Sequence, residues 1–102
     1  MLRARQPGLS RAAKLLQRIL DPAAEQGIPF DDLVRLLGAL GFTLRRIAGS
    51  HRIFARPGVV EILNLQPRND GSAKPYQLRQ VRRVILRYGL HLHLDREGTD
   101  AS

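Results

Sequence analysis

Hydrophobic residues recur every three or four positions in three separate stretches of the chain, which is the spacing of one buried helical face. Ser10 is a favoured N-cap residue, and Pro75 suits the first turn of a helix. Gly41 and Gly89 follow the last apolar positions of two stretches, where glycine commonly ends a helix. The pattern therefore predicts helices at residues 11–20, 30–40 and 75–88.

The hydrophobic period changes between the second and third predicted helices. Branched and aromatic residues form short runs there, and glycine-containing turns separate them. A tight loop at Pro57-Gly58 would place His51 opposite Asn64 in the sheet. We therefore expect three antiparallel strands, at residues 42–47, 51–56 and 59–65.

This register also predicts which face of the sheet is buried. Ile53 would lie opposite Ile62, and that apolar face would turn to the core. Phe54 and Glu61 would lie on the other face. Because Pro-Gly is not the favoured dipeptide of a tight hairpin, a longer loop with the opposite face buried stays open.

The order of elements predicts an α+β fold. We expect a double-stranded-RNA-binding-like sandwich: a three-stranded antiparallel sheet with two helices on one face, plus an extra N-terminal helix. The apolar face of that extra helix must be buried on the sandwich, in a dimer or against a partner. Alternating leucine and histidine at 90–94 suggests one more short strand. The expected division is a flexible basic arm at 1–9, the extra helix and linker at 10–28, the main domain at 29–94 and a disordered tail at 95–102.

The charge balance favours a polyanionic partner, either nucleic acid or an acidic protein. The chain has 17 Lys and Arg against 9 Asp and Glu, a net charge of +8, and all the bases except Lys14 and Lys74 are arginine. Arginine presents a planar fork that matches phosphate oxygens. Codon preference in the source organism would also explain the excess of arginine over lysine, but not the net charge.

Cysteine is absent, so disulfides and thiolate metal sites are excluded. Neither a run long enough to span a membrane nor a secretion signal is evident. Cytoplasm is therefore the expected compartment.

Basic side chains gather in the predicted sheet and on the last predicted helix. Arg79, Arg83 and Arg87 align at i, i+4 and i+8 with no acid among them. Like charges at this spacing repel, so the arrangement favours a polyanion, although an acidic patch on a protein partner or simple solubility would also account for it. Phe54, Tyr76 and Tyr88 are the candidates for stacking on bases. The expected RNA-binding residues are Arg45, Arg46, Gly49, Ser50, Arg52, Lys74, Arg79, Arg82 and Arg83.

Gly49-Ser50-His51 begins the second predicted strand in a frame that resembles the HicA family of toxin–antitoxin modules. The likeness runs from about residue 30 to about residue 90 and includes Leu40-Gly41-Phe42 and Leu44-Arg45-Arg46. It implies the double-stranded-RNA-binding-like fold and ribosome-independent cleavage of mRNA without metal or other cofactor. It also implies a HicB-type antitoxin that covers the active surface, so that the chain would act alone or in a toxin–antitoxin hetero-oligomer, with a homodimer also open.

His51 is the residue best suited to chemistry on RNA. Each ribose carries its own nucleophile, the 2′-hydroxyl, and imidazole titrates near pH ~6.5, so a histidine can move the required protons. The glycine in Gly49-Ser50 lets backbone approach a phosphate. From residue chemistry alone, a strand-edge histidine hydrogen-bonded to the turn is the favoured interpretation; the resemblance implies the catalytic one.

A second proton-transfer group is not evident. Many HicA members have another histidine late in the third strand, where this chain reads Asn-Leu-Gln-Pro-Arg at 64–68. Glu61 is the only acid between Asp32 and Asp70, and in the predicted register it lies on the opposite face from His51 or simply pairs with an arginine. Two further readings therefore stay open: a non-catalytic RNA-binding module of the same fold, and a protein-interaction domain with a basic face. The pair His91 and His93 has a spacing that a metal can use, but an exposed strand explains it as well.

Overall fold

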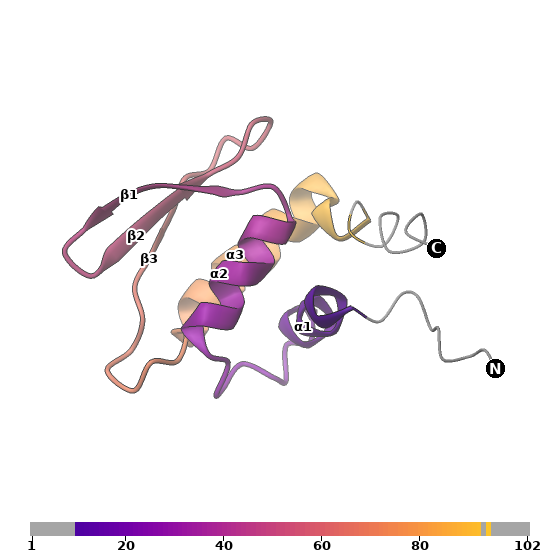
Figure 1. Ribbon diagram of the computed structural model, residues 1–102. Helices are drawn as coiled ribbons and strands as arrows, with labels where there is room; N and C mark the ends of the chain where they lie inside the picture. Colours follow the sequence, from indigo (N-terminus) through magenta and orange to yellow (C-terminus); the bar gives the residue numbers. More distant parts are fainter. Residues whose placement is uncertain (1–9, 93, 95–102) are drawn as a thin grey trace.

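The computed structural model of the chain describes residues 10–92 and residue 94, so the expected arm at 1–9 and tail at 95–102 lie outside the described residues. The strands form one antiparallel sheet in the order β1-β2-β3, and α2 and α3 lie together against it (Figure 1). The predicted α+β sandwich with an extra N-terminal helix is confirmed. Its elements are α1 (Arg11–Leu20), α2 (Phe30–Ala39), β1 (Thr43–Ala48), β2 (His51–Ala55), β3 (Leu63–Leu65) and α3 (Pro75–Tyr88).

The buried face of the sheet carries Phe54, Leu63 and Leu65, which join the core of α2 and α3. Phe54 lies opposite Leu63, and Ile53 lies opposite Asn64. Ile62 is 62% exposed, so the expectation that the face of Ile53 and Ile62 is buried was wrong.

The connection between β2 and β3 is also longer than the tight loop that was expected. A turn does form at Pro57-Gly58, where the Val59 N–H donates to the Arg56 carbonyl at 3.1 Å. Pairing resumes only at Leu63, so the strand expected at 59–65 is limited to its last three residues. The register differs by two residues from the expected one, so the same residues still share each face. The face that carries Phe54, Leu63 and Leu65 is the buried one because its larger apolar side chains fill the core.

The segment after α3 is helical, not extended. Residues 90–92 and 94 have helical geometry, and Leu90 and Leu94 are both buried. Their spacing of four residues places both leucine side chains on one face of a helical turn, so both can pack into the core. The strand expected at 90–94 was therefore wrong. Across the described part of the chain, every helix is too short or too polar to cross a membrane.

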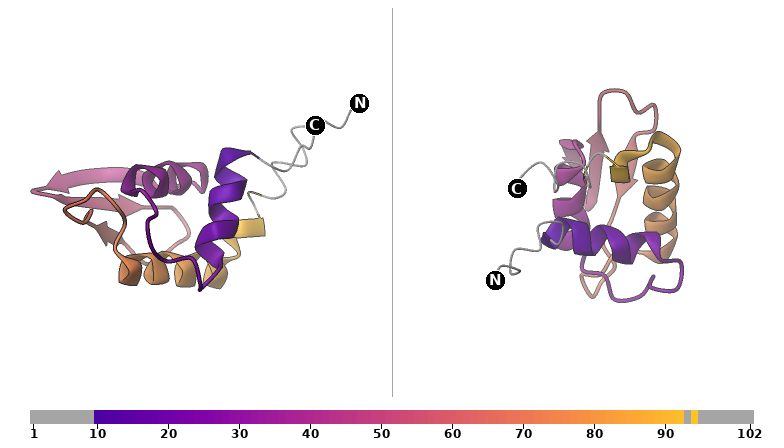
Figure 2. Two further views of the ribbon diagram at one scale, coloured as in Figure 1. Left: turned by 90° about the horizontal axis from the view of Figure 1, so that it is seen from below. Right: turned by 90° about the vertical axis from the view of Figure 1, so that its right-hand side faces the viewer.

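The extra helix α1 packs on the sandwich itself. Ser10 caps it by accepting a hydrogen bond from the Ala13 N–H at 3.1 Å. Its inner face buries Ala13, Leu16 and Ile19, and Leu16 and Ile19 belong to the common core. In Figures 1 and 2, α1 lies at the end of the molecule away from the tip of the β1–β2 hairpin. The apolar face of α1 is therefore buried on the sandwich, which is one of the three locations expected for it.

Arg82 of α3 ties α1 and the following linker to the domain. Its Nε donates to the Ile19 carbonyl at 2.7 Å, and its Nη1 lies 3.1 Å from the Glu25 carboxylate. Arg79 binds the other oxygen of Glu25 at 2.8 Å. Only 14% of the Arg82 side chain is exposed, against 49% for Arg79. The basic face of α3 is therefore partly neutralised by an acid from a distant part of the sequence.

Arg82→Ala should destabilise the fold far more than Arg79→Ala. Truncating Arg82 leaves the Ile19 carbonyl without its donor and breaks a charge-assisted bond, a loss of about 2–3 kcal/mol. Truncating the more exposed Arg79 should cost less than about 1 kcal/mol. Urea denaturation of both variants measures the difference, and equal losses would show that the backbone contacts of Arg82 contribute nothing.

The pKa of Glu25 lies below its usual value. Partial burial acts to raise this pKa and is the largest single influence, but the hydrogen bonds and charges of Arg82 and Arg79 together outweigh it. A carboxyl with a lowered folded pKa stabilises the protein above its unfolded pKa, and this stabilisation is lost as the pH falls through the folded pKa.

The melting temperature of the wild type should therefore fall on acidification from about pH 6 to about pH 3, and the fall should be smaller in Glu25→Gln. Calorimetry at a series of pH values tests this, because the variant has no proton to bind at that position. Parallel curves for the two proteins would contradict a contribution from Glu25.

Candidate active site

The turn that precedes β2 consists of Gly49 and Ser50. Ala48 lies opposite His51, so these two residues alone close the β1–β2 hairpin. Gly49 has φ +63°, a conformation that favours glycine, and a Cβ there would meet no atom within 4 Å. The turn therefore needs glycine for its backbone geometry, and its surroundings are open to an incoming group.

His51 lies beside this turn, on the face of the sheet that the helices do not cover. Its Nδ1 is 2.9 Å from Oδ1 of Asn64, and both side chains are exposed. Asn64 has Ile53 as its backbone partner, so His51 reaches it diagonally across the strands. The contact expected between these two side chains thus forms, although in a different register. It occupies Nδ1 and leaves Nε2 without a hydrogen-bond partner within the described structure.

One cation, Arg46, lies near His51 on this open face, and a second, Lys74, contacts the chain just after β3. Arg46 of β1 lies opposite Ile53, which puts it diagonal to His51, and diagonal neighbours are roughly 7–8 Å apart. On the other side, Lys74 Nζ donates to Gln66 Oε1 at 3.4 Å. Gln66 follows Asn64 by two residues, roughly 7 Å along an extended chain. Of the predicted site residues, Arg46, Gly49, Ser50 and His51 are therefore brought together. Lys74 lies at the start of α3 and contacts Gln66, and Arg45 lies at an irregularity of the exposed edge strand β1.

Arg52 faces the other way. Its guanidinium lies 5.7 Å from the ring centroid of Phe30 and donates to the Ser50 carbonyl at 3.2 Å. It therefore braces the turn from the helix side of the sheet. Arg56 has a similar internal contact, because its Nε donates to the Leu40 carbonyl at 2.7 Å and lies against Gly41.

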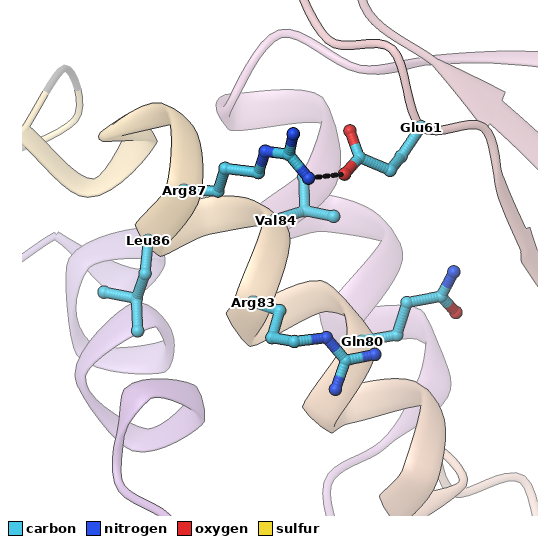
Figure 3. A pocket seen from close by; sticks show the side chains of 6 residues that line it. All are labelled: Glu61, Gln80, Arg83, Val84, Leu86 and Arg87. Carbon is cyan, nitrogen blue, oxygen red and sulfur yellow. Dashed lines mark hydrogen bonds and ion pairs between the residues drawn. The ribbon is translucent and has the colours of Figure 1, made fainter.

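Glu61 lies apart from His51, on the connection that follows the other end of β2. It accepts a hydrogen bond from the Tyr88 hydroxyl at 2.7 Å and pairs with Arg87 at 3.3 Å. The Tyr88 hydrogen bond is the main cause that lowers the pKa of Glu61, with the charge of Arg87 acting in the same sense. Glu61 and Arg87 line a groove of about 490 Å³ beside α3, and Figure 3 shows the ion pair between them. Arg83 lines the same groove and has no ion pair within the described residues.

The three aromatic candidates for base stacking differ in their exposure to solvent. Phe54 is buried in the core, so its expectation was wrong. Tyr88 is partly buried against the core, and its hydroxyl donates to Glu61. Tyr76 is 57% exposed and follows Lys74 by two residues in the chain. It is the one aromatic candidate that lies open near the His51 end of the sheet.

The sequence interpretation missed Gln77, the polar residue most deeply placed near the site. Only 5% of it is exposed. Its Oε1 accepts from the Gln66 N–H at 3.1 Å, and its Nε2 donates to the Asn64 carbonyl at 3.5 Å. The available signal was a glutamine at helical spacing within the inner stripe of α3. Over the described ranges, no group of three or more His, Cys, Asp or Glu gathers to hold a metal ion.

Comparison with known families assigns the chain to one of them. No curated protein and no solved structure matches the chain. Residues 30–87, more than half of the chain, match the family described as "HicA toxin of bacterial toxin-antitoxin". The match begins with α2 and ends within α3, so it includes the whole sheet and leaves α1 outside. The chain therefore belongs to the HicA family, and it is the toxin of a toxin–antitoxin module.

Proposed function

We propose that this toxin is an endoribonuclease that cleaves mRNA in the cytoplasm, with His51 as general acid and base. The observation that carries the proposal is the exposed imidazole of His51 on an open sheet face, with Nε2 unoccupied beside a glycine turn. A HicB-type antitoxin would neutralise the toxin by covering this face. Membership in a toxin family supports an activity that harms the cell, and the net charge of +8 supports RNA as its target.

The reaction needs only groups that RNA and the site provide. Nε2 of His51 takes the proton from a ribose 2′-hydroxyl, O2′ bonds to phosphorus, and the bond from phosphorus to O5′ breaks. The leaving O5′ receives a proton from the imidazolium or from water. The products are a 2′,3′-cyclic phosphate and a 5′-hydroxyl. Arg46, which is diagonal to His51, would stabilise the negative charge that gathers on the phosphoryl oxygens, with Lys74 as a second candidate for this role.

The RNA would lie along the hairpin and the open face rather than along α3. Arg45, Arg46 and Lys74 are the proposed backbone ligands, with Tyr76 for stacking on a base. Arg79 and Arg82 remain candidates only through their charge, because both already bind Glu25. Arg83 would contact RNA only if the strand continued around to the groove beside Glu61.

A non-catalytic RNA-binding toxin is the second candidate. The position that follows β3 on the open face is Gln66, whose amide does not transfer protons at neutral pH. Cleavage would thus depend on His51 alone. In the binding-only case, RNA stays intact and His51 is dispensable for toxicity.

His51→Ala should lower the rate of RNA cleavage by about 100-fold or more, because general acid–base catalysis by one group contributes at least that much. RNA affinity should stay within about 2-fold, since the substitution removes none of the arginine and lysine charges that bind phosphate. Purified proteins would be incubated with a defined mRNA in EDTA, and the expressed variants would be scored for growth arrest.

His91→Ala is the matched control, because it removes a histidine from the helical turn after α3 and should leave cleavage intact. Full cleavage by His51→Ala would overturn the catalytic role. Tight binding by the wild type with no cleavage of any RNA tested would favour the binding-only toxin.

Arg46→Ala should weaken RNA binding, whereas Arg35→Ala should not. Both variants remove one exposed arginine, but Arg35 lies on α2 beside α1, away from His51. Losing one phosphate contact should also reduce the slope of log K against log salt by about 0.7 for single-stranded RNA. Fluorescence anisotropy at several salt concentrations measures both effects. Equal changes in the two variants would mean that net charge, not this face, governs binding.

A further inference from the structure

We infer that Asn64 is a positioning residue for His51, and that it makes Nε2 the nitrogen that accepts the proton of the RNA. The inference deepens the proposed function and rests on it for its catalytic consequence. The geometry itself is independent of any activity. It consists of the 2.9 Å contact from Nδ1 of His51 to Oδ1 of Asn64.

The contact determines where the single proton of a neutral imidazole lies. An amide oxygen only accepts hydrogen bonds, so the proton must be on Nδ1 for the bond to form. Nε2 then keeps its lone pair, which is what a general base needs. In water the other tautomer of histidine, with the proton on Nε2, is favoured. Asn64 would therefore reverse the ordinary preference and aim the lone pair away from the sheet.

Asn64 does this without adding charge. Carboxylates that orient a histidine also stabilise its protonated form, whereas an amide orients the ring without adding a charge. Arg46 lies diagonal to His51 across β1, Lys74 contacts Gln66 beyond β3, and Arg52 lies on the opposite side of the sheet. None of the ion pairs among the described residues involves His51. The site is thus arranged for an imidazole that starts the reaction without a proton on Nε2.

The backbone of Asn64 is held by its neighbours rather than by its own side chain. Leu63 and Leu65 on either side are fully buried. Gln77 of α3 contacts the Asn64 carbonyl and the Gln66 N–H. Because the Asn64 side chain is exposed and not needed for packing, replacing it should leave the fold intact. Thermal melts of the variants verify this point.

The first test measures the tautomer directly and needs no RNA. In ¹⁵N-labelled wild type at alkaline pH, NMR should show the proton of His51 on Nδ1 and none on Nε2. In Asn64→Ala the population should move to the tautomer with the proton on Nε2. Asn69→Ala is the matched control, since Asn69 lies in the exposed loop after β3, and it should resemble the wild type. An unchanged tautomer in Asn64→Ala would overturn the inference even if His51 proves catalytic.

The second test separates positioning from binding. Asn64→Ala should lower kcat on the order of 10-fold, the scale reported when the orienting partner of a functional histidine is removed, while KM stays within about 2-fold. Asn64→Asp should retain orientation and move the acidic limb of the pH–rate profile to higher pH, because a carboxylate favours the protonated imidazole.

A change in KM alone would assign Asn64 to RNA binding and overturn the positioning role. If His51→Ala proves fully active, the proposed catalysis fails, and the tautomer measurement still decides whether Asn64 orients the ring. The two failures are therefore distinguishable.

Discussion

The register between β2 and β3 is the constraint on which the site depends. Pairing Phe54 with Leu63 turns the largest apolar side chains of both strands toward α2 and α3. Because side chains alternate along a strand, the same pairing turns His51 and Asn64 outward together. A slip by one residue would bury the imidazole and expose the phenyl ring, which would cost roughly 2–3 kcal/mol for Phe54 alone. The hydrophobic core therefore decides the position of the residue proposed for catalysis.

The helices and the fold class could be predicted from the sequence because their signals are local. Ser10, Pro75 and Gly89 act within one turn of a helix, and all three lie at the positions expected of them. The buried face of the sheet could not be predicted from alternation, because both faces carry apolar residues and the choice depends on which set packs against α2 and α3. The same distinction holds for the candidate site. The turn at Gly49 and Ser50 could be predicted because its signal is local, whereas the contacts of Gln77 form only when α3 packs on β3.

Arginine serves three separate purposes here, and composition alone does not distinguish them. Arg82 is largely buried and holds backbone carbonyls of α1 and its linker. Arg52 stacks on Phe30 and supports the turn from beneath. Arg46 is exposed on the face of His51. An arginine at helical spacing with no nearby acid in the sequence suggested a surface for polyanions, but Glu25 reaches α3 from the linker. A long flexible base is thus as useful for joining distant segments as for binding phosphate.

The presence of a single proton-transfer group on the open face makes its orientation more important. In a site with two such groups, one takes the proton of the nucleophile while the other protonates the leaving oxygen, and each needs only one geometry. With Gln66 as the next outward position after Asn64, the proposed reaction would require the imidazole of His51 to serve the first step in a defined tautomer and then release its proton. A neutral partner such as Asn64 suits this cycle, because a carboxylate would hold the imidazolium and slow the return of the proton. Asn64 and Gln77 thereby connect the packing of α3 on the sheet to the chemistry proposed at the hairpin.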